Sequence, residues 1–449
     1  MPSRMHRNHG LRLTLGMRMR IRQAATIPCL ALLLAGCAGL RTAPSPASQT
    51  TVVLVSIDAL RADVVGSGTM PTLDAIAADG VHARWMDPSY PTLTFPNHYT
   101  LVTGLRPDHH GMVHNRMRDA QLGAFVSKGA SAADGRWWAG GEPLWVTMER
   151  AGQRSAVLFW PGSAAEIHGE RPSQWRPFDK TMSVDARVRQ VLDWLDLPAA
   201  KRPRLIAAYF DQVDIAGHRC GAHCADEIAA ERAVDAGLAE LRAGIAARSR
   251  GRRIDLVVVS DHGMADVANG HIRYLDDIVP ADSIEFEDDG PVVLVAPRAG
   301  HETEAMRLLG RHDHSECWRR ESLPPAWHYG TNPRIPAIVC QADEGWLLEV
   351  HSDKPFAQPV KGEHGYAPEL PSMRATFVAE GPDFRRGVEL PPFDNVDVYP
   401  LLARLLGIAP LANDGDIAPL LPALQPQERP FGRDMPDRAP KGAPTAISK

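Results

Sequence analysis

The chain has 449 residues, of which 44% are hydrophobic and 23% are charged, and its formal net charge is −5 at pH 7. This length and hydrophobic content suffice for one large domain or two ordinary ones, and they exclude a predominantly disordered chain. Without the arginine-rich first 36 residues the net charge falls to about −11, which argues against nucleic-acid binding through a general basic surface.

The first 36 residues have the pattern of an export signal. Six arginines and no acidic residue precede the apolar stretch IPCLALLLAG, which is too short to span a bilayer as a stable helix. The stretch leads into LAGC, which resembles the lipobox of bacterial lipoproteins and implies lipidation of Cys37. Because Ala38 is not the aspartate that favours inner-membrane retention, we expect an outer-membrane anchor on the periplasmic side. An ordinary cleaved signal is the alternative.

Four cysteines remain beyond the lipobox, an even number for a chain exported to an oxidising compartment. They allow three pairings, among which the sequence does not choose. We favour the disulfides Cys220–Cys224 and Cys317–Cys340. A metal site formed by Cys220, His223 and Cys224 is an alternative for the first pair.

A Pro/Ser-containing tether, 37–50, precedes a segment of alternating strand and helix patterns, 51–415. Apolar, β-branched runs without alternation are typical of strands buried on both faces. Helix-like segments separate these runs, so the sequence predicts an α/β fold with a mostly parallel central sheet and helices on both faces. The expected strands are 51–60, 155–160, 204–210, 254–260 and 375–381, and the expected helices include 185–197 and 225–249.

Two parts of the chain depart from this alternation. Residues 267–363 contain short strand patterns, several prolines and the segment RHDHSECWRR, and we expect a cap or insertion subdomain there. Residues 416–449 are rich in proline, and we expect a loosely ordered tail.

Acidic and histidine side chains follow the expected strands. In an open parallel α/β sheet the carboxyl ends of the strands border the ligand site, so residues distant in sequence converge there. Unpaired buried carboxylates are costly, and three imidazoles with three carboxylates suit two zinc ions, with manganese as the alternative. Two such ions can act together in a displacement at phosphorus. The six residues are Asp58, Asp214, His218, Asp261, His262 and His364.

Each of these residues also has an ordinary structural interpretation. Asp58 could cap a helix, and SDHG at 260–263 could form a turn. The four-residue spacing of Asp214 and His218 occurs by chance in many helices. Their joint position at strand ends is the feature that favours a metal site.

The segment YPTLTFPNHYTLVTG, 90–104, places Thr94 just before a helix-like pattern. The Thr94 hydroxyl could cap this helix or act as a nucleophile, and the two roles are compatible. A free threonine hydroxyl is a poor nucleophile at neutral pH, and coordination by a metal ion would activate it. The helix N-terminus would add N–H donors and positive potential toward a phosphoryl group.

Together these motifs resemble the nucleotide pyrophosphatase/phosphodiesterase branch of the alkaline phosphatase superfamily. The resemblance runs from Val52 to Gly415 and implies an alkaline-phosphatase-like fold with two Zn²⁺ per chain. Departures from the usual family pattern occur in DQVDIAGH, in RCGAHC and in APEL after HGY, and they leave the substrate preference open. The supporting segments are SIDALR, 90–115, FWPGS, DIAGH, VVVSDHGM, NPRIPAIV, HGY and NVDVYPLLARLLGI.

The resemblance assigns roles to individual residues. Thr94 corresponds to the nucleophile, and Asn115 corresponds to the side chain that hydrogen-bonds a phosphoryl oxygen. Phe95 corresponds to a residue that packs on the nucleotide base. The ligands of the zinc that activates the nucleophile correspond to Asp58, Thr94, Asp261 and His262, and those of the other zinc correspond to Asp214, His218 and His364.

The implied activity is that of a phosphoric diester hydrolase that acts on nucleotides, releases nucleoside 5′-monophosphates and forms a phosphothreonine intermediate. Alternatives on the same two-zinc site are a phosphomonoesterase, a phosphonate hydrolase and a phospholipid-headgroup diesterase. A binding lipoprotein without activity is a further class, but such a protein should have relaxed its metal sites, and here every ligand position is filled. The expected partners are small phosphate diesters and, through Cys37, a membrane.

Overall fold

The computed structural model describes residues 49–351 and 360–426. The expected signal peptide, the part of the expected tether before residue 49 and the expected lipidation site at Cys37 lie outside the described residues, as do residues 427–449. Within the described ranges, no helix is both long and apolar enough to cross a membrane.

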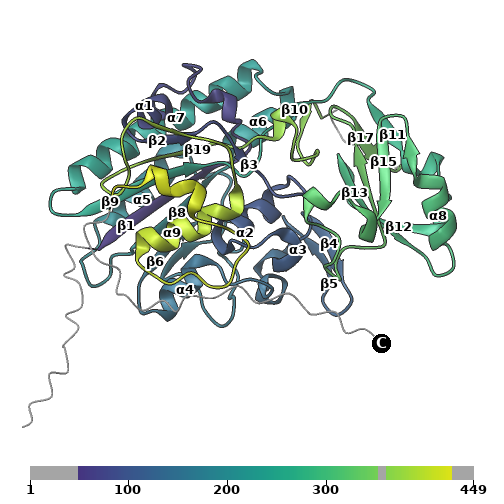
Figure 1. Ribbon diagram of the computed structural model, residues 1–449, viewed down its shortest axis with the longest axis horizontal. Coiled ribbons are helices and arrows are strands. Elements are labelled where there is room, and N and C mark those ends of the chain that lie inside the picture. The colour runs from purple at the N-terminus through teal and green to yellow at the C-terminus, as the bar shows by residue number, and fades with distance from the viewer. Residues whose placement is uncertain (1–48, 352–359, 427–449) are drawn as a thin grey trace, which may run out of the picture. The chain divides into compact units, whose positions relative to one another are not determined.

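An eight-stranded sheet forms the centre of the described chain (Figure 1), with the strand order β20-β2-β19-β9-β1-β8-β6-β7. Neighbouring strands are parallel, except that β19 runs antiparallel to both of its neighbours. The mostly parallel sheet that the sequence predicts is therefore confirmed. The strands are β1 (Thr50–Ile57), β2 (Val81–Ala83), β6 (Ser155–Leu158), β7 (Gln174–Arg176), β8 (Leu205–Phe210), β9 (Arg253–Val259), β19 (Phe377–Glu380) and β20 (Val388–Leu390).

Strand β1 is buried along its whole length because helices cover both faces of the sheet. Successive side chains of a strand point to opposite faces, and accordingly Val52 and Val53 belong to two different apolar clusters. Helices α2, α4 and α9 contribute to the first cluster, and α1, α5 and α7 contribute to the second. The helices are α1 (Pro71–Asp79), α2 (Thr94–Thr103), α4 (Leu144–Arg150), α5 (Val184–Leu195), α7 (Ala225–Arg248) and α9 (Val398–Leu406).

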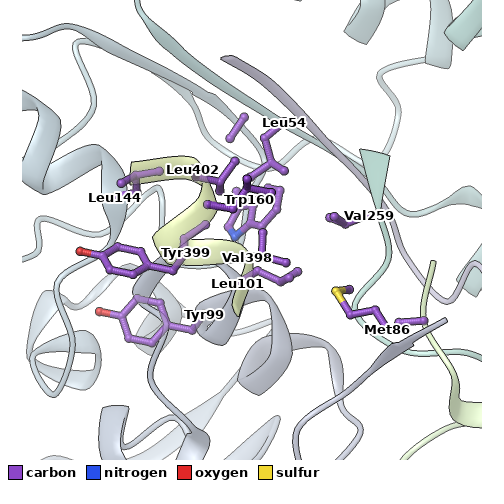
Figure 2. Packing of buried hydrophobic residues seen from close by; sticks show 14 of the residues in the cluster. Leu54, Met86, Tyr99, Leu101, Leu144, Trp160, Val259, Val398, Tyr399 and Leu402 are labelled. Carbon is purple, nitrogen blue, oxygen red and sulfur yellow. The ribbon is translucent and has the colours of Figure 1, made fainter. Parts of the chain in front are cut away.

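The first of these clusters fixes the position of α2. Figure 2 shows Leu54 of β1 and Leu101 of α2 packing around Trp160, together with side chains of α9. The indole N–H of Trp160 also donates a hydrogen bond of 3.0 Å to the carbonyl of His98 in α2. Burying apolar surface stabilises such a cluster by roughly 25 cal/mol per Å². Helix α2 is thus held against the sheet by packing around a tryptophan that is itself hydrogen-bonded to the helix.

Residues 284–342 form a second, antiparallel sheet with its own apolar cluster, and we refer to this unit as the cap (Figure 1). It falls within the segment 267–363 that the sequence singles out, and α8 (Glu302–Leu309) packs on β15. Cys317 and Cys340 face each other on β15 and β16 and form a disulfide. The strands, in sheet order, are β12 (Ile284–Glu287), β13 (Val292–Pro297), β16 (Ile338–Ala342), β15 (Ser315–Arg319) and β14 (Arg311–His312).

Short strand pairs lie outside the two sheets in the described ranges. They are β3 (Met86–Asp87) with β21 (Phe393–Asp394), β4 (Arg116–Asp119) with β5 (Gly123–Val126), β10 (Ala265–Asp266) with β18 (Gly362–Glu363), and β11 (Ile272–Tyr274) with β17 (Leu347–Glu349).

The start of the proline-rich tail differs from the loose order expected for 416–449. Residues Ala418–Ala423 form a short 3-10 helix in which Leu420 is fully buried. Leu424 forms a backbone bridge with Phe384, and both side chains are buried. These apolar side chains pack on the outer strand β20 and are buried there. The proline content of the segment does not indicate this packing.

Candidate active site

Three of the predicted metal ligands come from the ends of neighbouring strands. Asp58 directly follows β1, and Asp261 and His262 follow β9, which pairs with β1 in parallel. The Nε2 atom of His262 lies 2.9 Å from Oδ2 of Asp261 and 3.5 Å from Oδ1 of Asp58. All three side chains are buried. We refer to Asp58, Asp261 and His262 as the first set.

The other three predicted ligands form a second set. Asp214 and His218 lie one turn apart on α6 (Gln212–Cys220), which begins just after β8, and His364 follows β18. Oδ1 of Asp214 lies 3.1 Å from Nε2 of His218 and 3.6 Å from Nε2 of His364. The side chain of His218 is 31% exposed, so the second set reaches solvent whereas the first does not.

The two sets adjoin, because the rings of His262 and His364 stack with their centroids 3.7 Å apart. In each histidine of the two sets, Nδ1 is held by a backbone carbonyl. Donation from Nδ1–H fixes the tautomer and leaves the lone pair of Nε2 directed at the carboxylates, as in histidines that bind metal ions. The three bonds join His218 to Gly362 (3.0 Å), His262 to Gly263 (2.9 Å) and His364 to Thr92 (2.9 Å).

The charges of the six residues favour a cation between them. Burial, followed by the charges of Asp261 and Asp214, raises the pKa of Asp58 well above its usual value. Burial opposes charge on His218, yet the carboxylates of Asp214 and Glu363 raise its pKa well above the usual value. Burial contributes with opposite sign in the two cases, but neighbouring carboxylates raise both pKa values, as expected where several negative groups lie close together.

The donor atoms themselves fit a metal ion. Oδ1 of Asp58 and Oδ1 of Asp214 are buried and accept no hydrogen bond from any described residue. Burial, together with the neighbouring His262, lowers the pKa of His364 to about 4, so this imidazole is neutral and able to coordinate. Within each set the ligand atoms lie within 4.8 Å of one another. Imidazole nitrogens combined with carboxylate oxygens suit zinc and related borderline ions.

Thr94 is the first residue of α2, and its hydroxyl does not cap the helix. Leu93 occupies the N-cap position, and its side chain makes no hydrogen bond to the helix. The Oγ1 atom of Thr94 instead lies 3.3 Å from Nε2 of His262 in the first set. The hydroxyl therefore stands at the junction between a helix N-terminus and the group of metal-ligand candidates.

Asn115 and Phe95 lie beside Thr94 and contact each other. The backbone N–H of Phe95 donates to Oδ1 of Asn115 at 3.0 Å, so the amide NH₂ is the part of Asn115 that can donate to a ligand. Phe95 is partly exposed, and its ring packs on Phe125 and Trp138 with centroid separations of 5.9 Å in both cases. The structure thus brings all nine predicted site residues to one region.

Two supporting residues were not predicted from the sequence. The hydroxyl of Tyr209 donates to Oδ2 of Asp58, and the His98 ring lies with Nδ1 3.2 Å from Oδ2 of Asp261. His98 also contacts Ser56 through Nε2 at 2.8 Å. The signal for His98 was available, since it lies one helical turn beyond Thr94. Nothing in the sequence around Tyr209 indicates a site residue, because the local pattern predicts only a buried strand.

Phe178 is a further residue that the sequence did not single out. Its side chain is 54% exposed, the largest value among the big apolar residues that the structure describes. Its ring packs edge-on against Phe159 at 5.5 Å and lies 6.3 Å from the ring of Tyr209, which bonds Asp58. An exposed aromatic ring so close to a polar site is a candidate ligand surface.

The structure pairs Cys220 with Cys224 in a disulfide at the end of α6, two residues beyond His218. In this arrangement the two sulfurs bond each other rather than a metal ion. Nε2 of His223 lies 3.8 Å from a carboxylate oxygen of Asp63.

The chain is similar to known proteins over most of its length. The family described as type I phosphodiesterase / nucleotide pyrophosphatase matches residues 52–367. The chain is 34% identical over 390 residues to an uncharacterised pyrophosphatase/phosphodiesterase of Schizosaccharomyces pombe, covering 83% of this chain and 80% of that protein. It is 32% identical over 376 residues to the bis(5′-adenosyl)-triphosphatase enpp4 of Xenopus laevis, covering 84% and 82%.

Other relatives are longer. The chain spans only 44% of the rat ectonucleotide pyrophosphatase/phosphodiesterase family member 3, to which it is 33% identical over 385 residues. Among solved structures, murine ectonucleotide pyrophosphatase/phosphodiesterase 5 superimposes with a TM-score of 0.79 at 30% identity, covering 84% of this chain and 100% of that one. That structure is of an inactive threonine-to-alanine variant in complex with AMP. The chain therefore belongs to the type I phosphodiesterase/nucleotide pyrophosphatase family.

Proposed function

We propose that the chain hydrolyses phosphodiester and phosphoanhydride bonds in nucleotides with two zinc ions and Thr94 as the nucleophile, releasing nucleoside 5′-monophosphates. The observation that carries this proposal is the 3.3 Å approach of Oγ1 of Thr94 to Nε2 of His262, at the start of a helix and beside two sets of three ligands. Family membership supports phosphodiester hydrolysis. The AMP bound to murine phosphodiesterase 5 and the dinucleotide activity in the name of the Xenopus relative support a nucleotide substrate.

The first set together with Thr94 would hold one ion, and the second set would hold the other. When bound, the ions supply Lewis-acid chemistry that lowers the pKa of the threonine hydroxyl and offsets the charge of the phosphoryl group. The protein contributes the geometry. Tyr209 fixes the carboxylate of Asp58 through a hydrogen bond, and Nδ1 of His98, which donates to the carbonyl of Thr94, lies 3.2 Å from the carboxylate of Asp261. Such supporting residues hold ligands in one orientation.

In the proposed reaction Oγ of Thr94 attacks phosphorus while the bond to the leaving oxygen breaks in line with it. The product is a phosphothreonine that retains the nucleoside ester. Water then attacks the same phosphorus, the bond to Oγ breaks, and the hydroxyl of Thr94 is restored. The amide NH₂ of Asn115 donates to a non-bridging oxygen, on which charge develops, and the positive potential at the start of α2 favours the same oxygens.

The diester preference is tested by comparing bis-p-nitrophenyl phosphate with p-nitrophenyl phosphate in the presence of zinc. We expect the soluble protein, starting near Ser45, to hydrolyse the diester at a much higher kcat/KM. A preference for the monoester would contradict the proposal and favour a phosphomonoesterase on the same metal site. A preference for phosphonate esters or for glycerophosphodiesters in a wider panel would favour the phosphonate hydrolase or the headgroup diesterase.

We propose that Phe95 and Phe178 provide stacking surfaces for the nucleotide base, because both rings remain partly exposed beside the site. Stacking of a base on an aromatic ring is worth about 1–3 kcal/mol, or roughly 5- to 150-fold in affinity. We therefore expect Phe95→Ala and Phe178→Ala to raise KM for the p-nitrophenyl ester of thymidine 5′-monophosphate within that range. The matched variant Phe95→Leu separates the loss of the aromatic face from the loss of volume.

Methyl p-nitrophenyl phosphate is the control substrate for this prediction, since it has the same leaving group and no base. Its KM should change little in either variant. An equal rise in KM for both substrates would mean that the two rings only support the fold.

We also propose that the protein acts outside the cytoplasm and is anchored to a membrane through lipidated Cys37. The two disulfides support an oxidising compartment. The LAGC motif supports the anchor. We expect Cys37→Ser to move the protein from the membrane fraction to the soluble fraction. A wild-type protein that is already soluble after fractionation would contradict the anchor without affecting the proposed activity.

A further inference from the structure

Hydrogen bonds from the cap converge on the segment that carries Asn115. This segment, 107–119, begins with α3 (Pro107–His110) and ends in β4. Bonds from the cap reach it at positions on both sides of Asn115, so the cap and this segment are fixed relative to each other. They join Asp108 to Gly330, Thr331 and Asn332, Arg334 to Gly111 and Asp119, Tyr329 to Val113, and Val292 to His114.

His114 is the member of this group that directly precedes Asn115. Its ring is 2% exposed, and Nε2 lies 3.3 Å from the carbonyl oxygen of Val292 in cap strand β13. Its other nitrogen, Nδ1, accepts the backbone N–H of Arg116 at 3.2 Å. One nitrogen must therefore donate and the other must accept, which defines a neutral imidazole. Burial also lowers the pKa of His114 to about 4, in agreement with that assignment.

The bond from Arg116 to His114 closes a turn around Asn115. This turn fixes the backbone on either side of Asn115, as comparable side-chain bonds two residues along the chain do elsewhere. The carbonyl of Asn115 accepts the N–H of Ser127 at 3.0 Å, and its Oδ1 accepts the N–H of Phe95 at 3.0 Å. Three hydrogen bonds thus restrain Asn115 and the backbone beside it, and the one made by His114 is connected to the cap.

We propose that His114 is a positioning residue, which ties the backbone of Asn115 to the cap and so aims the Asn115 amide at the phosphoryl group. The proposal rests on the role of Asn115 in the proposed function. A hydrogen-bond donor lowers an activation barrier only if it is already in place when charge develops. Displacing a reacting or stabilising group by about 1 Å can cost up to about 100-fold in rate. The cap would then contribute to catalysis without touching the substrate.

Two substitutions separate the two bonds of His114. In His114→Asn the side-chain oxygen occupies the place of Nδ1 and can accept the N–H of Arg116, but the bond to Val292 is lost. In His114→Gln the terminal NH₂ can still donate to Val292, but the bond from Arg116 is lost. We expect each variant to lower kcat on the diester by about tenfold, with KM and zinc content unchanged. His312→Asn is the matched control, because this cap histidine also bonds a carbonyl, at 2.7 Å, and lies outside the segment.

The decisive measurement is a double-mutant cycle with Asn115→Ala. If His114 acts through Asn115, His114→Asn and His114→Gln lower kcat by less than about twofold in the Asn115→Ala background. Full tenfold losses in that background would overturn the proposal, because His114 would then act independently. If Asn115→Ala alone leaves kcat unchanged, the assigned role of Asn115 fails, and the proposal fails with it for a distinguishable reason. Thermal unfolding of each variant shows whether a loss of activity is only a loss of fold.

Discussion

Thr94→Ala is expected to lower kcat for diester hydrolysis by about 10⁴-fold or more, while the three residues of the first set still retain their zinc ion. The reason is that Oγ1, 3.3 Å from Nε2 of His262, is the nucleophilic atom in the proposed reaction, and alanine has no substitute for it. The measurement is steady-state hydrolysis of bis-p-nitrophenyl phosphate. Acid quenching followed by mass spectrometry of the intact chain should show a phosphorylated species in the wild type and none in the variant.

Thr94→Ser is the matched control for this prediction. Serine keeps a hydroxyl at the first position of α2, so the variant should retain activity within about 10- to 100-fold of the wild type and should still form the covalent species. An alanine variant that keeps a tenth or more of the wild-type rate would show that water attacks the substrate directly. In that case the position of Thr94 beside the first set would have a structural explanation only.

Removal of the metal ions should abolish the activity, and zinc should restore it. We expect two zinc ions per chain in the wild type and about one in Asp58→Asn or Asp214→Asn, because these two residues belong to different sets. Each substitution should reduce kcat by more than the roughly 10- to 100-fold that is usual for residues that only support a ligand. Metal analysis by mass spectrometry, together with rates after dialysis against a chelator, measures both effects.

The exposure of His218 adds a kinetic expectation to the metal experiment. The second set reaches solvent and the first set is buried, so a chelator should remove the ion at Asp214 and His218 before the ion at Asp58. Asp226→Asn serves as the control, since this exposed acid on α7 belongs to neither set. A single ion in the wild type, with no change in Asp214→Asn, would contradict the two-ion proposal.

The sequence predicts the sheet and the location of the site because both depend on local patterns. Apolar runs at 51–60 and 254–260 have no alternation, which is possible only if both faces are covered, and they became β1 and β9. A parallel sheet places the carboxyl ends of its strands at one edge. Asp58 and Asp261 therefore lie at the same edge once these runs are assigned to one parallel sheet, and they meet because β1 pairs with β9.

Other features depend on contacts that no local pattern encodes. The apolar run at 375–381 does not reveal that β19 runs antiparallel to its neighbours, since parallel and antiparallel buried strands have similar compositions. Tyr209 lies in β8 and Phe178 follows β7, and their rings come together only through tertiary packing. The bonds of His114 depend on a cap whose register is set far along the chain. Such residues can be recognised as part of the site only once the three-dimensional arrangement of the strands is known.

The central position of β1 also constrains how this chain can acquire its fold. Its two hydrogen-bonded neighbours are β8, which begins at Leu205, and β9, which begins at Arg253. The first strand of the domain therefore gains its first partner only when the chain reaches Leu205 and its second only at Arg253. Long-range pairing of this kind makes folding slow and leaves apolar surface open to aggregation. For the same reason a truncation that removes Thr50–Ile57 would take out the middle of the sheet, not one of its edges.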